Sequence, residues 1–445
     1  MLSRPSGTVR TCVLLGVLAT SGVAILELVR EQTGTPGFFV GLGLALFPVP
    51  ALMAAFRWLG RVSPGPWPCL LYCFGWGACA AALIAILANS FATEWIAAAT
   101  ADPSDADQLG SVAIAPVVEE SAKAAALLLV FLFRRRLLTG FTDGFVLAGF
   151  TATGFAFTEN ILYLGNAFGE DLGSGTAALD SLTAATFFVR IMLSPFAHPL
   201  FTVLTGLGFG AAALCGRRSA RIGLPLLGLA LAMGAHALWN SSSELGEYGF
   251  YLVYGCVMVP VFVLLAVLAV RLRQRQLRAV GSELAVYAAA GWLSPVEARA
   301  LASMPARALA RSLARHAGGR PARRVVLRYE ADAAELALLR YRARRGGPAR
   351  VPEFAERERE LLRRIWLRRP QAGPALIRAA MMEELVPPVL PPAVVPPVVP
   401  AAVVPPVVPP ARTGVRRSVP WIPARPADPS SSHRPYALPG ADGPR

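Results

Sequence analysis

The sequence predicts an all-α protein, a polytopic transmembrane helical bundle of about eight spans, followed by a small cytoplasmic helical domain and a disordered proline-rich tail. Hydrophobic residues make up 54% of the 445 residues and charged residues only 16%, against roughly 25% charged in an average soluble domain. The mean hydropathy is +0.49. Apolar residues also gather in runs of about 20, the length that a helix needs to cross a hydrocarbon core of about 30 Å. A soluble globular protein or a fibrous protein is therefore excluded.

The spans form the first predicted domain, residues 1–270. Windows of about 19 residues place them near 11–30, 37–56, 67–91, 110–133, 142–167, 187–214, 222–241 and 248–270. Arginines cluster at the N-terminus and in every second connection, whereas the connections between are acidic or nearly neutral. Because basic loops stay in the cytoplasm, we expect a multi-pass protein of the cell membrane with both termini cytoplasmic and the lipid bilayer as its surroundings.

Two further regions follow the spans. Residues 271–385 have apolar positions three or four apart, such as Leu336 and Leu339, and Pro295 after Ser294 is typical of a helix start. These features predict a small cytoplasmic helical domain. Residues 386–445 begin with a Pro/Val-rich tract that favours polyproline II, so we interpret them as a disordered linker or as a docking site for a proline-recognising partner. The net charge of +15 lies mostly in arginines beyond residue 270, and no nucleic-acid partner is expected.

Ionisable and amide side chains inside the spans are few, and each needs a reason because a charge at the bilayer centre costs about 2.5–3.5 kcal/mol. They occur in four different spans and, by the rise of a helix, at similar depths in the outer half of the bilayer. The set is Glu119, Glu120 and Lys123, then Glu159 and Asn160, then His198, and finally His236 and Asn240. Four helices are therefore predicted to deliver polar groups to one place.

Spacing within these helices assigns roles. Glu119 and Lys123 are four residues apart and share a face, whereas adjacent carboxylates diverge by about 100°. We therefore expect Lys123 to orient only one of Glu119 and Glu120, while the other faces a cavity. Pro199 frees a backbone carbonyl and is expected to break the helix beside His198.

A carboxylate and two imidazoles are suited to hydrolysis of an amide. They can activate water by direct general-base action or through a bound zinc ion. In the working hypothesis Glu119 or Glu120 activates the water and the other holds it. His198 and His236, with Glu159, position the water or ligate zinc, and Asn240 stabilises the oxyanion. Lys123 and Asn160 have supporting roles.

Four ordered motifs lie within a core of 110–245. They are Pro-Val-Val-Glu-Glu-Ser-Ala-Lys at 116–123, Gly-Phe-Ala-Phe-Thr-Glu-Asn at 154–160, Ala-His-Pro-Leu-Phe-Thr at 197–202 and His-Ala-Leu-Trp-Asn at 236–240. Together they resemble the motifs of the PrsW-type intramembrane proteases, which are related to the CAAX prenyl endopeptidases. The resemblance implies site-1 cleavage of single-span substrates such as anti-sigma factors, with Glu119 and Glu120 essential. The family is commonly classed with the metalloproteases, which implies a metal such as zinc.

Two other functions remain open at this point. The same polar cluster suits a non-catalytic scaffold subunit, in which Glu119, Glu120 and Lys123 only fix helix packing. Its carboxylates also suit a proton-coupled transporter, but the sequence lacks the internal repeats and paired broken helices that many transporters have. A protease is the prediction that accounts for the histidines as well as the acids.

Overall fold

The computed structural model describes residues 7–100, 108–175, 181–346 and 354–383. Within these ranges every regular element is a helix and no strand occurs, so the all-α prediction is confirmed. The chain divides into two compact units, Met1–Leu277 and Arg278–Arg445. The division falls inside helix α12 (Val259–Ala289). The predicted tail 386–445, with its possible docking site, lies outside the described residues.

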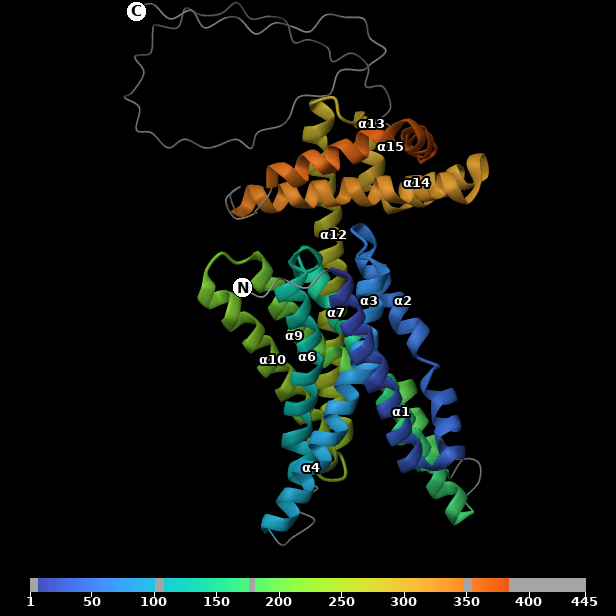
Figure 1. The fold of residues 1–445 in the computed structure, drawn as a ribbon, viewed down its shortest axis with the longest axis vertical. Coiled ribbons are helices and arrows are strands. Elements are labelled where there is room, and N and C mark those ends of the chain that lie inside the picture. The colour runs from blue at the N-terminus through green and yellow to red at the C-terminus, as the bar shows by residue number, and fades with distance from the viewer. Residues whose placement is uncertain (1–6, 101–107, 176–180, 347–353, 384–445) are drawn as a thin grey trace, which may run out of the picture. The chain divides into compact units, whose positions relative to one another are not determined.

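The first unit is a bundle of helices (Figure 1). Its elements are α1 (Gly7–Ala45), α2 (Val49–Leu59), α3 (Trp67–Gly75), α4 (Ala82–Thr100), α6 (Ala115–Phe133), α7 (Phe141–Ser174), α8 (Leu182–Phe187), α9 (Ala197–Leu214), α10 (Arg218–Asn240), α11 (Gly249–Val253) and the start of α12.

Six stretches of the described chain are long and apolar enough to cross a membrane. They are Cys12–Val62, Trp67–Ala98, Phe141–Ser174, Leu182–Leu214, Arg218–Asn240 and Gly249–Ala289. The predicted number of eight is therefore approximate. Two predicted spans fall within Cys12–Val62, where α1 continues through a kink at Gly34 (φ 69°) instead of ending. The predicted span 110–133 contains α6, in which Glu119, Glu120 and Lys123 place three ionisable residues within five positions, so it is not one of the six.

Several helices contain or adjoin π-helical turns, which widen the helix and often occur at functional sites. They lie at Trp76–Ala81, Gly110–Ile114, Phe188–Leu193 and Tyr254–Met258. Gly110–Ile114 leads directly into α6, and Phe188–Leu193 precedes a break before α9. Two of the turns therefore adjoin helices that carry the predicted site residues.

Helix α7 is the most deeply packed element of the first unit, with contacts to α1, α2, α3 and α9. Small residues let the backbones approach closely, as is usual between helices in membranes. A Cβ atom added to Gly144 would lie 2.0 Å from the carbonyl oxygen of Gly206 in α9, and one added to Gly154 would lie 2.0 Å from that of Phe74 in α3. These contacts fix α7, which carries Glu159, against its neighbours.

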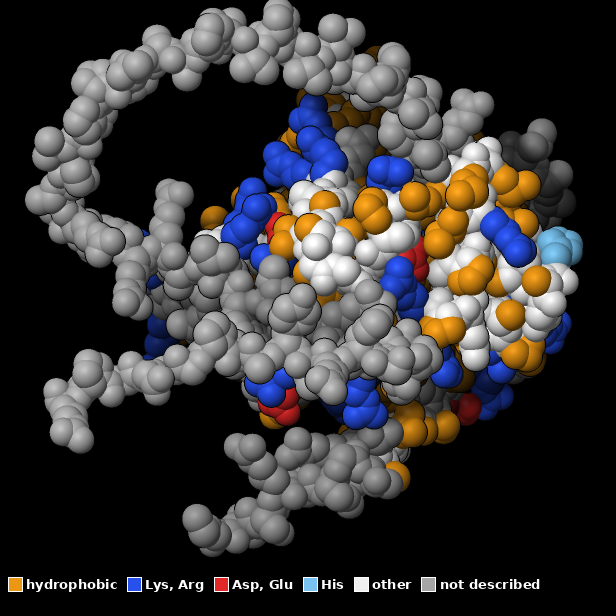
Figure 2. Space-filling view, turned by 90° about the horizontal axis from the view of Figure 1, so that it is seen from above, with side chains coloured by type: hydrophobic (Ala, Val, Ile, Leu, Met, Phe, Trp, Pro, Cys, Tyr) orange, Lys and Arg blue, Asp and Glu red, His pale blue; other side chains and the backbone are white. Residues whose placement is uncertain are grey.

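The second unit is helical, as the sequence predicts for this region. It comprises the end of α12, α13 (Pro295–Ala302), α14 (Met304–Gly346) and α15 (Phe354–Met382). Helix α13 begins as predicted, with Pro295 at its first position and a capping box between Ser294 and Glu297. The apolar residues Leu336 and Leu339 are buried where α14 packs on α15. Basic side chains outnumber acidic ones on the face that Figure 2 shows.

Candidate active site

Helix α6 supplies three buried charged groups in two turns. Lys123 Nζ donates hydrogen bonds to Glu119 Oε2 at 3.2 Å and to Glu120 Oε1 at 2.9 Å. Lys123 and Glu120 are fully buried, and Glu119 is 6% exposed. The expectation that Lys123 orients only one carboxylate is therefore wrong. Positions three and four residues before a lysine are both its neighbours on a helix, and the ammonium lies between them.

The two carboxylates nevertheless have different surroundings. Glu120 Oε1 lies 3.2 Å from His236 Nδ1, and Thr202 donates a hydrogen bond of 2.9 Å to Glu120 Oε2. Glu119 instead lies on the wall of a cavity. Because Glu120 contacts Nδ1 of the His236 ring, Nε2 of that ring is directed at Glu119 Oε2, 3.9 Å away. Glu120 thus orients His236, and Glu119 remains accessible from the cavity.

His198 lies in the first turn of α9 and contacts charged groups through both ring nitrogens. Its Nε2 atom is 2.5 Å from Glu159 Oε2, and its Nδ1 atom is 3.2 Å from Lys123 Nζ. The predicted helix break is present, but it lies at residues 194–196 because α9 begins at Ala197. Pro199 therefore lies in the first turn of α9, where proline is tolerated.

Arg190, from the turn Phe188–Leu193, holds Glu159 and Asn160 of α7. It donates hydrogen bonds to Glu159 Oε2 at 2.6 Å and to Asn160 Oδ1 at 2.9 Å. Its guanidinium also lies over the Tyr163 ring, 3.9 Å from the centroid. Arg190 has no role in the sequence-based prediction, although it lies at the outer edge of the predicted span 187–214, against the general charge pattern. That exception was the signal for a site residue.

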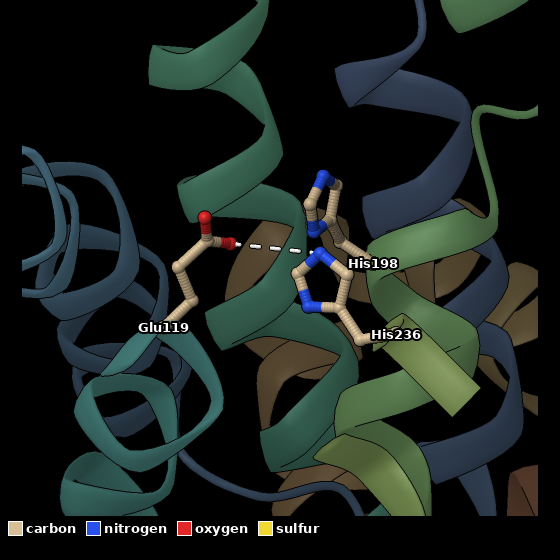
Figure 3. Close-up of side chains that lie close together, drawn as sticks. All are labelled: Glu119, His198 and His236. Carbon is tan, nitrogen blue, oxygen red and sulfur yellow. Dashed lines mark ion pairs between the residues drawn. The ribbon is translucent and has the colours of Figure 1, made fainter. Parts of the chain in front are cut away.

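Three candidate donors converge from three helices. Glu119 of α6, His198 of α9 and His236 of α10 each place one donor atom within 4.8 Å of the other two, and Figure 3 shows their side chains directed at one another. The two rings stand nearly perpendicular, 5.3 Å apart between centroids, and His236 stacks on Phe201. The carboxylate that lies near both histidines is thus Glu119. Glu159, the carboxylate predicted as a metal ligand, contacts only His198 among the histidines of the described chain.

The donor set fits a metal ion. Two imidazoles and one carboxylate form a common set at catalytic zinc sites, where neighbouring donor atoms lie about 3.4 Å apart. The 3.9 Å from Glu119 Oε2 to His236 Nε2 needs only a small further approach. Lys123 Nζ contacts two of the donor groups, so a bound metal would take over these contacts and leave Lys123 paired with Glu120.

A cavity of about 510 Å³ opens beside these donors. Its walls include Glu119, Glu159, His198 and His236. Asn240 at the end of α10 also lines this cavity, and it donates a hydrogen bond of 2.8 Å to the carbonyl oxygen of Ser111. A role for Asn240 in oxyanion stabilisation stays a prediction. The cavity provides room for a peptide segment and water next to the acidic and imidazole groups.

One comparison with known proteins identifies most of the first unit. Residues 65–265 match the family model described as PrsW family intramembrane metalloprotease. This segment belongs to the PrsW family. The predicted resemblance is therefore confirmed, and the match extends beyond the motif core of 110–245. Comparisons with curated proteins and with solved structures gave no match.

The PrsW-family segment contains every residue of the site described above. The chain is accordingly an intramembrane protease with a buried Glu/His/His group suited to a metal. Thr202, like Arg190, has no role in the sequence-based prediction, although it lies four residues after His198 and hence on the same face of α9. The ring of Phe155, which lies 3.7 Å below Lys123 Nζ, also went unassigned.

Proposed function

We propose that this protease cleaves a peptide bond in or beside the membrane-spanning helix of a single-span protein, such as an anti-sigma factor. The observation that carries the proposal is the convergence of Glu119, His198 and His236 on the wall of one cavity within a bundle of apolar helices. A substrate helix must unwind locally before its amide can be attacked. The break at residues 194–196, beside His198, separates the turn Phe188–Leu193 from α9, so the helix on that side of the cavity is interrupted.

In a metal-free site Glu119 is the residue assigned to proton transfer, whereas with a metal bound it would be a ligand. It faces the cavity, and a carboxylate within reach of a bound water accepts the proton that the water loses on attack. Lys123 keeps the Glu119 side chain in place through its 3.2 Å contact.

The histidines position the reacting groups, and other residues fix their rings. Glu120 contacts Nδ1 of His236, and Glu159 contacts Nε2 of His198. Carboxylates that bind the second ring nitrogen set the tautomer and the ring orientation. Glu119, His198 and His236 would hold the metal, for which zinc is the ion that the donor set suits, and such a metal supplies a Lewis acid and a more acidic water.

The direct test is cleavage of a single-span substrate reconstituted with the purified chain in liposomes. Glu119→Gln should abolish cleavage while the unfolding temperature stays near that of the wild type. Glu170→Gln is the matched control, because Glu170 is an exposed acid at the end of α7. Cleavage by Glu119→Gln at the wild-type rate would overturn the proposal.

A scaffold function is the second candidate. The observation that favours it is that Lys123 pairs with both Glu119 and Glu120, so each acid has a basic partner within α6 without any substrate. A scaffold predicts that Glu119→Gln lowers stability and that the wild type cleaves no substrate. The two functions are therefore separated by the same experiment.

We further propose that the cell membrane holds the protein with both termini in the cytoplasm, as the arginine-rich connections imply. Labelling of single introduced cysteines from either side of intact cells tests this orientation.

A further inference from the structure

A second, smaller cavity adjoins the one described above. It measures about 210 Å³ and lies between α1, α4, α6 and α7. The two cavities share Asn89, Glu119, Glu159 and Tyr163 in their walls. A group that entered the smaller cavity would therefore pass directly beside the Glu119 carboxylate.

Two sides of the smaller cavity are lined by apolar side chains, and Gln32, Ser90 and Thr158 also contribute to its wall. Ala82, Ala85 and Ile86 of α4 form one side, and Phe155 and Leu162 of α7 form the other. Engineered apolar cavities of about 150 Å³ hold a benzene molecule. A space of about 210 Å³ therefore accommodates an aliphatic side chain or a single aromatic ring.

Asn89 gives this cavity a polar group for which the fold provides no partner. Its Oδ1 atom is buried and accepts no hydrogen bond from the described part of the chain. A buried acceptor without a partner costs about 1–3 kcal/mol, so a donor from outside the chain is favoured there. The backbone N–H group of an unwound peptide is such a donor, and Asn89 lines both cavities.

We propose that the smaller cavity is a substrate subsite that receives the apolar side chain of a residue flanking the scissile bond, and that Asn89 accepts a hydrogen bond from the substrate backbone. This inference rests on the proposed protease function. The peptide bond then lies at Glu119, where the cavities meet, and the side chain beside it points between α4 and α7. The subsite selects substrates by side-chain size.

The test uses two substitutions on α4 that change the volume of the cavity in opposite directions. Ala85→Val fills the subsite and Ile86→Ala enlarges it. Cleavage rates are measured for a series of reconstituted substrates with Ala, Val, Leu or Phe at each residue that flanks the cleaved bond. A few methyl groups in a pocket change selectivity about tenfold or more. The kcat/KM ratio of Phe over Ala substrates should fall about tenfold in Ala85→Val and rise in Ile86→Ala.

Ala88→Val is the matched control, because Ala88 lies on the same helix and lines neither cavity. The kcat/KM ratio of Phe over Ala substrates in Ala88→Val should equal that of the wild type. A general disturbance of α4 would lower all rates without moving the ratio in opposite directions. If Ala85→Val fails to fold, Ile86→Ala with the substrate series still decides.

Asn89→Leu tests the hydrogen bond separately. This substitution keeps the approximate volume and removes the acceptor, so kcat/KM should fall about tenfold for all substrates alike and the Phe/Ala ratio should stay constant. An unchanged kcat/KM would overturn the role of Asn89. Ratios unchanged in both α4 variants would overturn the subsite and would point to a lipid acyl chain as the occupant. A wild type that cleaves no single-span substrate would instead refute the protease proposal itself.

Discussion

Glu120 Oε1 lies 3.2 Å from His236 Nδ1, whereas the adjacent Glu119 faces the other side of the same ring at Nε2, 3.9 Å away. Two neighbouring glutamates in α6 thus contact opposite edges of one imidazole. Glu120 orients the ring, and Glu119 lies on the cavity wall, where Nε2 of the ring points toward it. This arrangement predicts different effects for substitutions at the two positions.

Glu120 is expected to act through His236. Glu120→Gln keeps an oxygen that accepts a hydrogen bond from His236 Nδ1 but loses the ion pair with Lys123, so kcat/KM should fall about tenfold. Glu120→Ala loses both contacts, and the decrease should approach 100-fold, the upper range for residues that support metal ligands. Metal affinity should fall in the same order. Equal effects of the two variants would contradict the orienting role.

Arg190 is expected to position Glu159 and, through it, His198. Arg190→Met removes the contacts to Glu159 and Asn160, so kcat/KM should fall about tenfold or more. Arg190→Lys should rescue part of this loss, because lysine pairs with Glu159 but lacks the planar fork that reaches both partners. Arg299→Met, at an exposed arginine of α13, is the control. Wild-type activity in Arg190→Met would refute this role.

Close packing of α7 on α9 is expected to contribute strongly to the stability of the first unit. A Cβ atom at Gly144 would lie 2.0 Å from the Gly206 carbonyl oxygen, whereas one at Gly234 meets nothing within 4 Å. Gly144→Ala should lower the free energy of unfolding by about 1–3 kcal/mol, the usual cost of overpacking. Gly234→Ala should be neutral or slightly stabilising, because alanine favours helix. Thermal unfolding in detergent measures both, and equal stability of the two variants would contradict the packing described.

The second unit is expected to lose stability as the pH rises. Burial raises the pKa of Glu330 to about 7 from its ordinary value of 4.5, although Arg311 and Arg307 oppose this. The folded form therefore holds the proton more tightly than the unfolded form. The stabilisation is complete below pH 4.5 and is lost progressively up to about pH 7, by about 3 kcal/mol at most.

Glu330→Gln should remove this pH dependence, because glutamine does not titrate. Hydrogen exchange of α14 peptides, compared between the full-length wild type and the variant at pH 5 and again at pH 8, measures the difference. The variant should exchange more slowly than the wild type at pH 8, and the advantage should shrink at pH 5. The same ratio of wild-type to variant exchange rates at both pH values would contradict the prediction.

Much of the site follows from sequence because helical periodicity fixes which residues share a face. The four-residue spacing of Glu119 and Lys123 gave their ion pair directly, and polar residues at similar depths in four spans indicated one cluster. Contacts between helices are not fixed in this way. Whether Glu119 or Glu159 approaches both histidines depends on side-chain rotamers and on how α6, α7, α9 and α10 pack. The pairing of Lys123 with both acids lies within α6, where spacings of three and of four residues both bring side chains together.

The number of spans could be predicted only approximately for a related reason. Tertiary packing decides whether a membrane helix tolerates a kink such as that at Gly34 or charges such as those of α6. Hydropathy alone therefore does not decide whether such segments count as separate spans. The start of α13, in contrast, was predictable to the residue. Its signal is the local pair Ser294 and Pro295, which requires no distant contact.

The most direct test of the central claim, that Glu119, His198 and His236 form one metal-binding hydrolytic site, is the metal content of the purified chain after zinc loading. About one zinc per chain is expected for the wild type and for His316→Ala, a control at an exposed histidine of α14. Glu119→Ala, His198→Ala and His236→Ala should each lose most of the metal while remaining folded. Zinc content unchanged by the substitution of any one of the three would contradict a shared site.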